Sequence, residues 1–213
     1  MTDFIYFWDE YLNDVPIYKN LLENYSKIKE EVLNFLKTPN SLFDYPKYEV
    51  FGKDLYENYW KAVPLSNFDG EYISSTSTPQ QKNLINYVIS NAKRNCPTIE
   101  SIIGDLEKEN NLVNTFISRL VPGSIINPHH GWTDDYLRIH LGLVCDPGCK
   151  ITVGKETKTW EEGKILAFKD GGPFLHSVKH EGTNERIILS VDVKLSYLEE
   201  YVPRISEYMV RKS

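Results

Sequence analysis

The histidines are the residues of this sequence whose type and spacing first suggest chemistry. All five lie between His129 and His180, in the C-terminal part of the chain. His129 ends a strand-like stretch, and His176 follows much later in the sequence. Neutral imidazoles are good ligands for a divalent first-row metal such as iron. By spacing alone, two unrelated surface or core histidines remain the alternative to a metal site.

The carboxylate that usually completes such a metal site is missing from its expected place. In the usual facial triad it stands two residues after the first histidine, and that position is Gly131. Asp134 and Asp135 lie further along the same segment, where their position favours contact with solvent or a substrate rather than a metal. A structural zinc is disfavoured because it would need four protein ligands.

Two further segments carry cationic side chains beside apolar strands. Alternation in residues 136–143 places Arg138 and His140 on one face of a strand and aliphatic residues on the other. That face could form an anion site inside a jelly roll, or it could lie outside with Arg138 in water. Arg186 begins an apolar strand and could bind a carboxylate through two parallel hydrogen bonds, or be an ordinary strand-end arginine. Ser118 lies on another strand with alternating apolar and polar residues, and by itself it indicates no function.

The part of the chain before residue 112 is predicted to be mainly helical. Apolar residues recur at helical spacing from Pro16 to Phe35, which predicts one amphipathic helix. A second helix should begin at Thr78, which can form a capping box with Gln81 and is followed by a proline suited to a first turn. The expected buried stripe of this second helix is Leu84, Ile85, Val88 and Ile89. A strand is expected at residues 59–65, between the two helices.

After about residue 112 the pattern changes to short strands separated by turns. Strands are predicted at residues 114–121, 136–144, 150–153, 164–168 and 186–195. Short strands at this spacing are typical of a sandwich or jelly roll. The chain is therefore predicted to be α+β and a single domain over residues 1–213. Its parts would be a mainly helical segment at 1–111 packed against a β core at 112–196, and a helical tail at 197–213.

Composition excludes several classes of function. The chain has 30 acidic and 24 basic residues and a net charge of −6, which disfavours nucleic acid and anionic membranes as partners. No apolar run approaches the ~20 residues of a membrane span, and the first residues lack the basic region of a signal peptide. Three cysteines do not form a disulfide framework, although Cys145 and Cys149 flank one turn. A cytoplasmic protein is the expectation.

Several motifs between Ser118 and Val193 together resemble the aspartyl/asparaginyl β-hydroxylase family. They are Pro-Gly at 122–123, Pro-His-His-Gly at 128–131, Leu-Arg-Ile-His-Leu-Gly-Leu at 137–143 and Gly-Cys-Lys-Ile at 148–151. The long run Glu-Thr-Lys-Thr-Trp-Glu-Glu-Gly-Lys at 156–164 follows, and then His176 and the strand that begins at Arg186. The resemblance covers about a third of the chain and extends weakly to Tyr59 and Trp60.

The resemblance implies a double-stranded β-helix of the jelly-roll or cupin-like kind that binds Fe(II), 2-oxoglutarate and O₂. His129 and His176 match its metal ligands, and the family leaves the third position to water, so Gly131 is expected. The cosubstrate-binding positions are matched by Ser118, His140 and Arg186. Arg138 belongs to the same pocket and would contact either the cosubstrate or the substrate. Positions assigned to the substrate are Trp60, Asp134 and Asp135.

The implied reaction is hydroxylation of an unactivated C–H bond in an amino-acid-like small molecule, a peptide or a protein side chain. One alternative is a halogenase, with chloride in the position beside Gly131, and another is a non-catalytic cupin-like binding protein. The segment 169–175 is longer than is usual in the family, and Tyr136 and the Asp134–Asp135 pair differ from the residues of some family members. The family's substrate therefore cannot be assigned to this chain. The acidic pair favours a cationic substrate, and unchanged affinity of Asp134→Asn and Asp135→Asn variants for such a substrate would contradict this.

Overall fold

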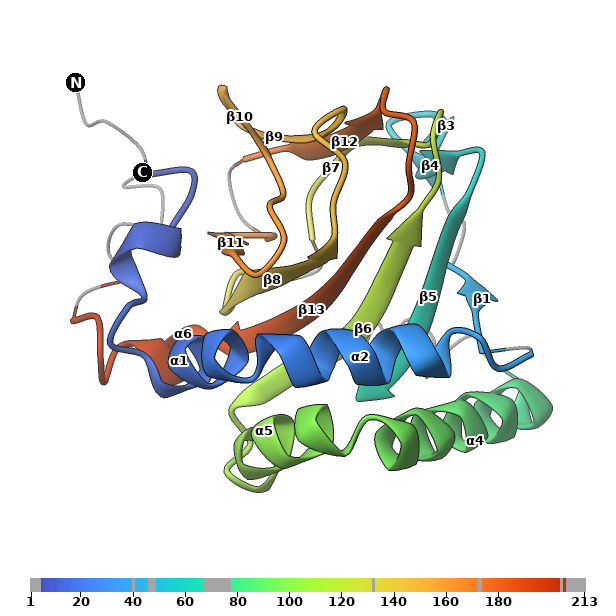
Figure 1. Cartoon of the computed structure of the whole chain (residues 1–213). Helices are drawn as coiled ribbons and strands as arrows, with labels where there is room; N and C mark the ends of the chain where they lie inside the picture. The colour runs from blue at the N-terminus through green and yellow to red at the C-terminus, as the bar shows by residue number, and fades with distance from the viewer. Residues whose placement is uncertain are drawn as a thin grey trace.

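Two antiparallel sheets face one another in the computed structural model, which describes residues 5–39, 41–45, 49–66, 78–131, 133–171, 174–203 and 205. The larger sheet has the strand order β1-β5-β6-β13-β8-β11, and the smaller one has the order β10-β9-β12-β7-β4 (Figure 1). A separate hairpin joins β2 and β3. This pairing of non-consecutive antiparallel strands across two facing sheets is a double-stranded β-helix, so the predicted α+β fold class is confirmed.

The strands of the larger sheet are long in its centre and short at its edges. They are β1 (Phe43–Asp44), β5 (Trp60–Ser66), β6 (Leu112–Leu120), β8 (Tyr136–Val144), β11 (Ile165–Phe168) and β13 (Arg186–Lys194). The smaller sheet and the hairpin contain β2 (Glu49–Val50), β3 (Lys53–Asp54), β4 (Tyr56–Glu57), β7 (Ile125–His129), β9 (Cys149–Val153), β10 (Glu156–Thr159) and β12 (His176–His180). All five strands predicted after residue 112 are present, as is the strand predicted at 59–65.

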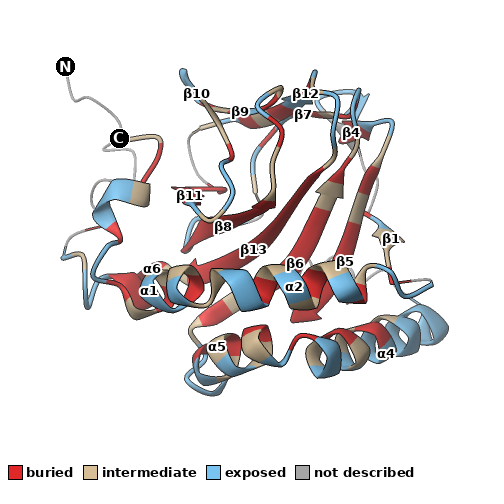
Figure 2. Cartoon of the chain, viewed as in Figure 1, coloured by how far each residue is buried: buried red, intermediate tan, exposed pale blue. Residues whose placement is uncertain are grey.

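Helices cover one side of the larger sheet. They are α1 (Pro16–Glu23), α2 (Tyr25–Phe35), α4 (Pro79–Asn95) and α5 (Pro97–Lys108), with a 3-10 turn η1 (Asp9–Tyr11) and a short α6 (Leu195–Leu198). Figure 1 shows α2, α4 and α5 lying across the outer face of β5, β6 and β13. Their exposed surfaces point away from the sheet, whose strands are mostly buried (Figure 2). Of the tail predicted at 197–213, residues 206–213 lie outside the described residues.

Two helix predictions need correction. The predicted single helix from Pro16 to Phe35 is divided at Asn24, which is the C-cap of α1 and the N-cap of α2. The second helix begins as predicted, with the Thr78–Gln81 capping box formed. Its expected stripe is confirmed only in part. Val88 is buried and Ile85 and Ile89 are partly buried, but Leu84 is 51% exposed, and the buried Ala92 was not predicted. The buried contacts of α4 thus lie in its C-terminal half.

Strand register decides which side chains enter the space between the sheets. On β13, Asp192 is directly opposite Arg138 of β8, and Ser190 is opposite His140. The alternate aliphatic residues of β8 pack on the outer side in the helix-facing core, so Arg138 and His140 point inward. The alternative, in which this face of β8 lies outside with Arg138 in water, is therefore wrong.

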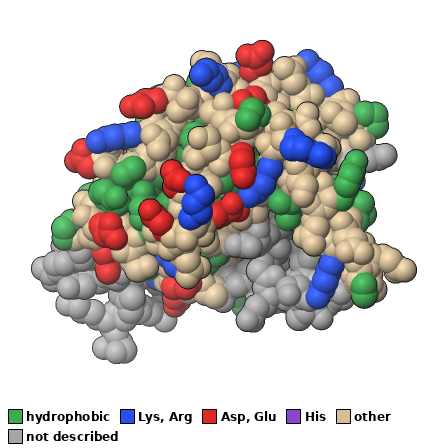
Figure 3. Space-filling model, turned by 90° about the horizontal axis from the view of Figure 1, so that it is seen from below, with side chains coloured by type: hydrophobic (Ala, Val, Ile, Leu, Met, Phe, Trp, Pro, Cys, Tyr) green, Lys and Arg blue, Asp and Glu red, His purple; other side chains and the backbone are tan. Residues whose placement is uncertain are grey.

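The surface of the helical side shows no concentration of one charge. Acidic and basic side chains are interspersed over this face (Figure 3). Among the described residues, no helix is both long enough and apolar enough to cross a membrane.

Candidate functional site

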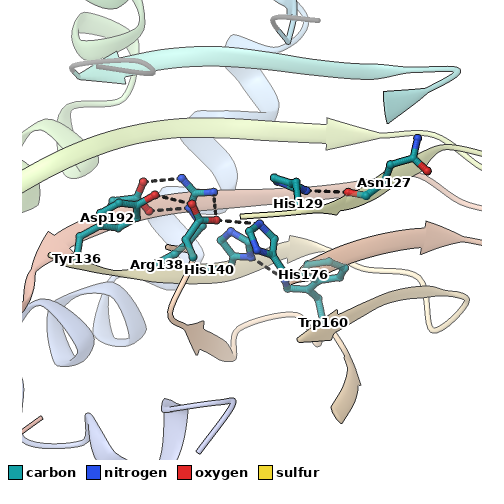
Figure 4. A network of polar contacts seen from close by, with 9 residues as sticks. Asn127, His129, Tyr136, Arg138, His140, Trp160, His176 and Asp192 are labelled. Carbon is teal, nitrogen blue, oxygen red and sulfur yellow. Dashed lines mark hydrogen bonds and ion pairs between the residues drawn. The ribbon is translucent and has the colours of Figure 1, made fainter. Parts of the chain in front are cut away.

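His129 and His176 lie side by side on neighbouring strands of the smaller sheet. The two residues are Cα partners in the β7–β12 ladder, and their ring centroids are 4.1 Å apart. Both side chains are buried, and both point into the space between the sheets (Figure 4). The β7 and β12 pairing therefore brings together two residues that are distant in the sequence.

The environment of the two imidazoles fits a divalent metal. The Nδ1 of His129 lies 2.8 Å from the backbone carbonyl of Asn127, which fixes the proton there and leaves Nε2 with a free lone pair. Burial, followed by the neighbouring His176, lowers the pKa of His129 to about 3, so the ring is neutral as a ligand must be. The Nδ1 of His176 is a buried nitrogen for which the structure gives no hydrogen-bond partner.

The place of the missing triad carboxylate is filled by another residue. A Cβ on Gly131 would collide with the carboxylate of Asp170 and would lie 2.6 Å from the hydroxyl of Tyr136. The backbone N–H of Gly131 also donates to the carbonyl of Asp170 at 2.8 Å. The carboxylate Oδ1 of Asp170 lies 3.0 Å from Nε2 of His176. Asp170 comes from the segment after β11, and the unusual length of that segment was its one signal in the sequence.

Arg138 is paired with two buried carboxylates. Its Nε and Nη2 donate to the two oxygens of Asp192 at 2.8 and 2.7 Å, and its Nη1 donates to Asp170. These two charges outweigh burial and raise the pKa of Arg138. The charge of Arg138, together with the hydrogen bond to His176, likewise outweighs burial and lowers the pKa of Asp170. A role for Arg138 at the cosubstrate or substrate remains a prediction, with most of its donors already used within the protein.

Arg186 has the opposite environment at the other end of the pocket. It is 2% exposed, and no carboxylate among the described residues forms an ion pair with it. Its Nη1 donates to Oγ of Ser118 at 3.1 Å, and its guanidinium lies 4.9 Å from the ring centroid of Trp160. Its Nε is buried without a hydrogen-bond partner. Burial lowers the pKa of Arg186, and a hydrogen bond with Cys149 offsets this only in part. Arg186 is therefore a buried cation without a carboxylate partner in the described part of the chain.

His140 lies between the two arginines as a neutral ring. Trp160 Nε1 donates to His140 Nδ1 at 3.2 Å, so the proton of the neutral imidazole is on Nε2. Burial, and then the charges of Arg138 and Arg186, hold the pKa of His140 well below its usual value. His140 is therefore available as an uncharged donor.

One pocket connects these groups, and it contains seven of the nine residues predicted for the site. They are Trp60, Ser118, His129, Arg138, His140, His176 and Arg186, and apolar side chains complete the lining. Trp60 Nε1 donates to Ser118 at 2.9 Å, which places it beside the predicted cosubstrate residues rather than apart from them. Asp134 and Asp135 are exposed and do not line this pocket. The sequence prediction missed Trp160, Asp170 and Asp192.

The fold and site define a class: a cupin-type double-stranded β-helix with neighbouring histidines on the smaller sheet and, in the same pocket, a buried arginine that has no carboxylate partner among the described residues. Solved structures to which this chain is similar include a 2OG-Fe(II) oxygenase-family oxidoreductase from Burkholderia pseudomallei. It is 12% identical, covers 85% of this chain and 92% of its own, and gives a TM-score of 0.45. A predicted oxalate decarboxylase from Thermotoga maritima is 18% identical over 42% of this chain and 72% of its own, with a TM-score of 0.35.

Sequence comparison then identifies the family. The family profile described as aspartyl/asparaginyl beta-hydroxylase matches residues 22–195, and the chain belongs to this family. Aspartate beta-hydroxylase domain-containing protein 2 of Mus musculus is 40% identical over 106 residues, which cover 47% of this chain and 30% of the relative. Aspartyl/asparaginyl beta-hydroxylase of Homo sapiens is 51% identical over 73 residues, which cover 34% of this chain and 9% of the relative. The matches thus span less than a third of these relatives' length.

Proposed function

We propose that this chain is an Fe(II)- and 2-oxoglutarate-dependent dioxygenase that hydroxylates an unactivated C–H bond. The substrate class is an amino-acid-like small molecule, a peptide or a protein side chain. Membership of the hydroxylase family supports the reaction type. The observation that carries the proposal is Arg186, a buried cation without a carboxylate partner in the described part of the chain, in the same pocket as His129 and His176.

A buried guanidinium without a counter-charge is costly, so its presence indicates a bound anion. 2-Oxoglutarate has a carboxylate at each end. One carboxylate would pair with Arg186, and the 2-oxo acid end would reach a metal held by His129 and His176. Bound iron supplies the activation of O₂, and the overall reaction converts substrate, 2-oxoglutarate and O₂ into hydroxylated substrate, succinate and CO₂.

The side chains around Arg186 are arranged to receive a carboxylate. The Oγ of Ser118 accepts hydrogen bonds from Trp60 and Arg186, so its own hydrogen is left to donate to a ligand oxygen. His140 offers a second, uncharged donor from its Nε2. The apolar lining of the pocket excludes water, which strengthens these hydrogen bonds.

Succinate formation with Fe(II), ascorbate, O₂ and 2-oxoglutarate tests the proposal directly, with His176→Ala as the variant that lacks a metal ligand. The sharper comparison is Arg186→Met against Arg119→Met, because Arg119 is half-buried and paired with Glu185. Loss of a charge-assisted hydrogen bond is worth about 1.5–3 kcal/mol. The Arg186→Met variant should therefore bind 2-oxoglutarate about 10- to 100-fold more weakly by calorimetry with Mn²⁺, while Arg119→Met binds it normally. Equal affinity in the two variants would contradict the proposal.

A further inference from the structure

The residues that precede the first helix lie along the edge of the larger sheet. Phe7 forms an antiparallel bridge with Phe168 of β11, the last strand of that sheet. Beside it, the N–H of Trp8 donates to the carbonyl of Ala167 at 2.7 Å. The family profile matches only from residue 22 onwards, so the family motifs assign no role to this N-terminal segment, residues 5–8.

Tyr6 of the N-terminal segment packs against the backbone that leads into His176. Its ring lies so close to Gly154 that a Cβ there would be 2.0 Å from Cε1 of Tyr6. The ring also meets that of Phe174 edge to face, with centroids 4.8 Å apart. The N–H of Gly154 donates to the carbonyl of Leu175 at 2.9 Å. Both residues directly before His176 are therefore held by Tyr6 or by the glycine beneath it.

Phe7 supports the same histidine through a second ring. It is 6% exposed, and its ring centroid lies 6.4 Å from that of Phe168. Phe168 lines the pocket, and its ring centroid lies 5.3 Å from that of His176 and 5.2 Å from that of His140. The N-terminal segment thus reaches His176 both along the backbone and through packed rings.

The two histidines of the metal site differ in how their rings are held. The Nδ1 of His129 lies 2.8 Å from the carbonyl of Asn127, on the same strand. The Nδ1 of His176 has no hydrogen-bond partner in the structure. The orientation of His176 therefore depends more on its backbone and on the side chains packed around it.

We propose that Tyr6 is a positioning residue for His176: its ring, packed on Gly154 and Phe174, fixes the start of β12 so that the imidazole of His176 stays beside that of His129. The inference rests on the proposed function and extends it to a segment that precedes the family motifs. When the ring is absent, the residues before His176 can adopt other conformations, and only the fraction with the two imidazoles side by side binds metal well.

The test uses Co²⁺ as the probe, read by calorimetry and by the visible absorption of the bound ion. Tyr6→Ala should bind Co²⁺ about three- to tenfold more weakly than the unsubstituted protein, which is the range that an edge-to-face ring pair accounts for. Tyr6→Phe keeps the ring and should keep the affinity. Tyr11→Ala is the matched control, because the ring of Tyr11 lies against Trp8 and is 50% exposed, and it should bind Co²⁺ normally.

Gly154→Ala displaces the same ring from the other side. Its methyl group would collide with Tyr6, so this variant should also bind Co²⁺ more weakly. In the Tyr6→Ala background the methyl group meets no ring, and the further loss of affinity should be less than about twofold. Losses that simply multiply in the double variant would show that the two residues act independently, which contradicts the proposed contact.

The outcomes separate this inference from the proposed function. If the unsubstituted protein binds Co²⁺ no better than His176→Ala does, both the proposed function and the positioning role are wrong. If binding depends on His176 but Tyr6→Ala matches Tyr11→Ala in affinity and spectrum, only the positioning role is wrong. It is also wrong if Tyr6→Phe binds as weakly as Tyr6→Ala. Urea unfolding with chelator present checks the fold of each variant, and Tyr6→Leu replaces Tyr6→Ala if the latter is poorly folded.

Discussion

At the scale of single residues, the two buried arginines of the pocket show how partners determine roles. Arg138 has two carboxylate partners, which accept hydrogen bonds from all three of its nitrogens, whereas Arg186 has a serine, an indole face and an unpartnered Nε. Removing a charge from water without a partner costs several kcal/mol. Arg138 is thus part of the protein's own ionic network, whereas Arg186 has no such network, which is why the ligand-binding role is proposed for Arg186.

Two buried serines on the inner face of the larger sheet allow a comparison of how much a hydrogen-bonded hydroxyl contributes to the free energy of unfolding. Ser118 Oγ accepts from Trp60 and Arg186, while Ser190 Oγ is buried without a hydrogen-bond partner. Ser118→Ala should lower the free energy of unfolding by about 1–3 kcal/mol, because it leaves buried donors unpaired. Ser190→Ala should change it by less than about 0.5 kcal/mol. Urea unfolding measures both, and equal losses would show that the Ser118 contacts do not stabilise the fold.

At the scale of elements, the sequence predicted strands well where one face is uniformly aliphatic. In β8 the alternation identified Arg138 and His140 as sharing a face, but periodicity could not say whether that face was inside. The answer depends on which strands lie beside β8, and β13 and β11 pair with it from distant positions in the sequence. The contact between Asp170 and His176 could not be predicted from the sequence either. It joins a loop to a strand, and it depends on how the two sheets pack rather than on a local pattern.

In α4, the local features were predicted correctly, but the extent of burial was not. The capping box at Thr78 is a local interaction and was predicted correctly. The buried stripe of α4 was predicted only in part: Val88 is buried, whereas Leu84 lies where the helix extends past the core and is exposed. Apolar spacing indicates which side of a helix can be buried. How many turns of that side are covered depends on the tertiary packing of the rest of the protein.

Glycines in two elements should respond in opposite ways to a methyl group. At Gly142 of β8, a Cβ would lie 2.3 Å from the backbone oxygen of Glu161, in the turn that is hydrogen-bonded to this strand. At Gly104 of α5, a Cβ would meet nothing within 4 Å. Gly142→Ala should lower the free energy of unfolding by about 1–3 kcal/mol, and Gly104→Ala should raise it by about 0.5–1 kcal/mol. Thermal or urea unfolding gives both signs, and a stabilised Gly142→Ala protein would contradict the packing described for β8.

At the scale of the whole molecule, the fold separates two kinds of interior. Helices and the outer face of the larger sheet enclose an aliphatic core, while the space between the sheets contains aromatic residues together with the polar pocket. The second interior holds His129 and His140, whose pKa values burial lowers. Burial and the two arginines hold the pKa of His140 well below its usual value, which makes folding sensitive to acid.

The sign of this effect follows from proton binding. The unfolded chain protonates His140 near pH 6.5, but the folded protein does so only at much lower pH. The unfolded state therefore binds more protons below about pH 6.5, and the free energy of unfolding should fall there by up to about 1.4 kcal/mol per pH unit from this group. The stabilisation is complete above pH 6.5 and is lost as the pH falls towards the folded-state pKa. Asp192, whose pKa burial raises to about 6, acts in the opposite direction over part of this range, so a single pH profile cannot isolate the histidine.

A comparison of variants removes that ambiguity, because Asp192 is present in all of them. Urea unfolding at pH 7.5, 6.5 and 5.5, with chelator present, should give a smaller loss of stability on acidification for His140→Asn than for the unsubstituted protein. His130→Asn is the control, since His130 is exposed at the end of β7, and it should leave the pH dependence unchanged. Both Arg138 and Arg186 act on His140. Identical pH profiles for His140→Asn and His130→Asn would therefore show that the acid sensitivity of the fold arises elsewhere.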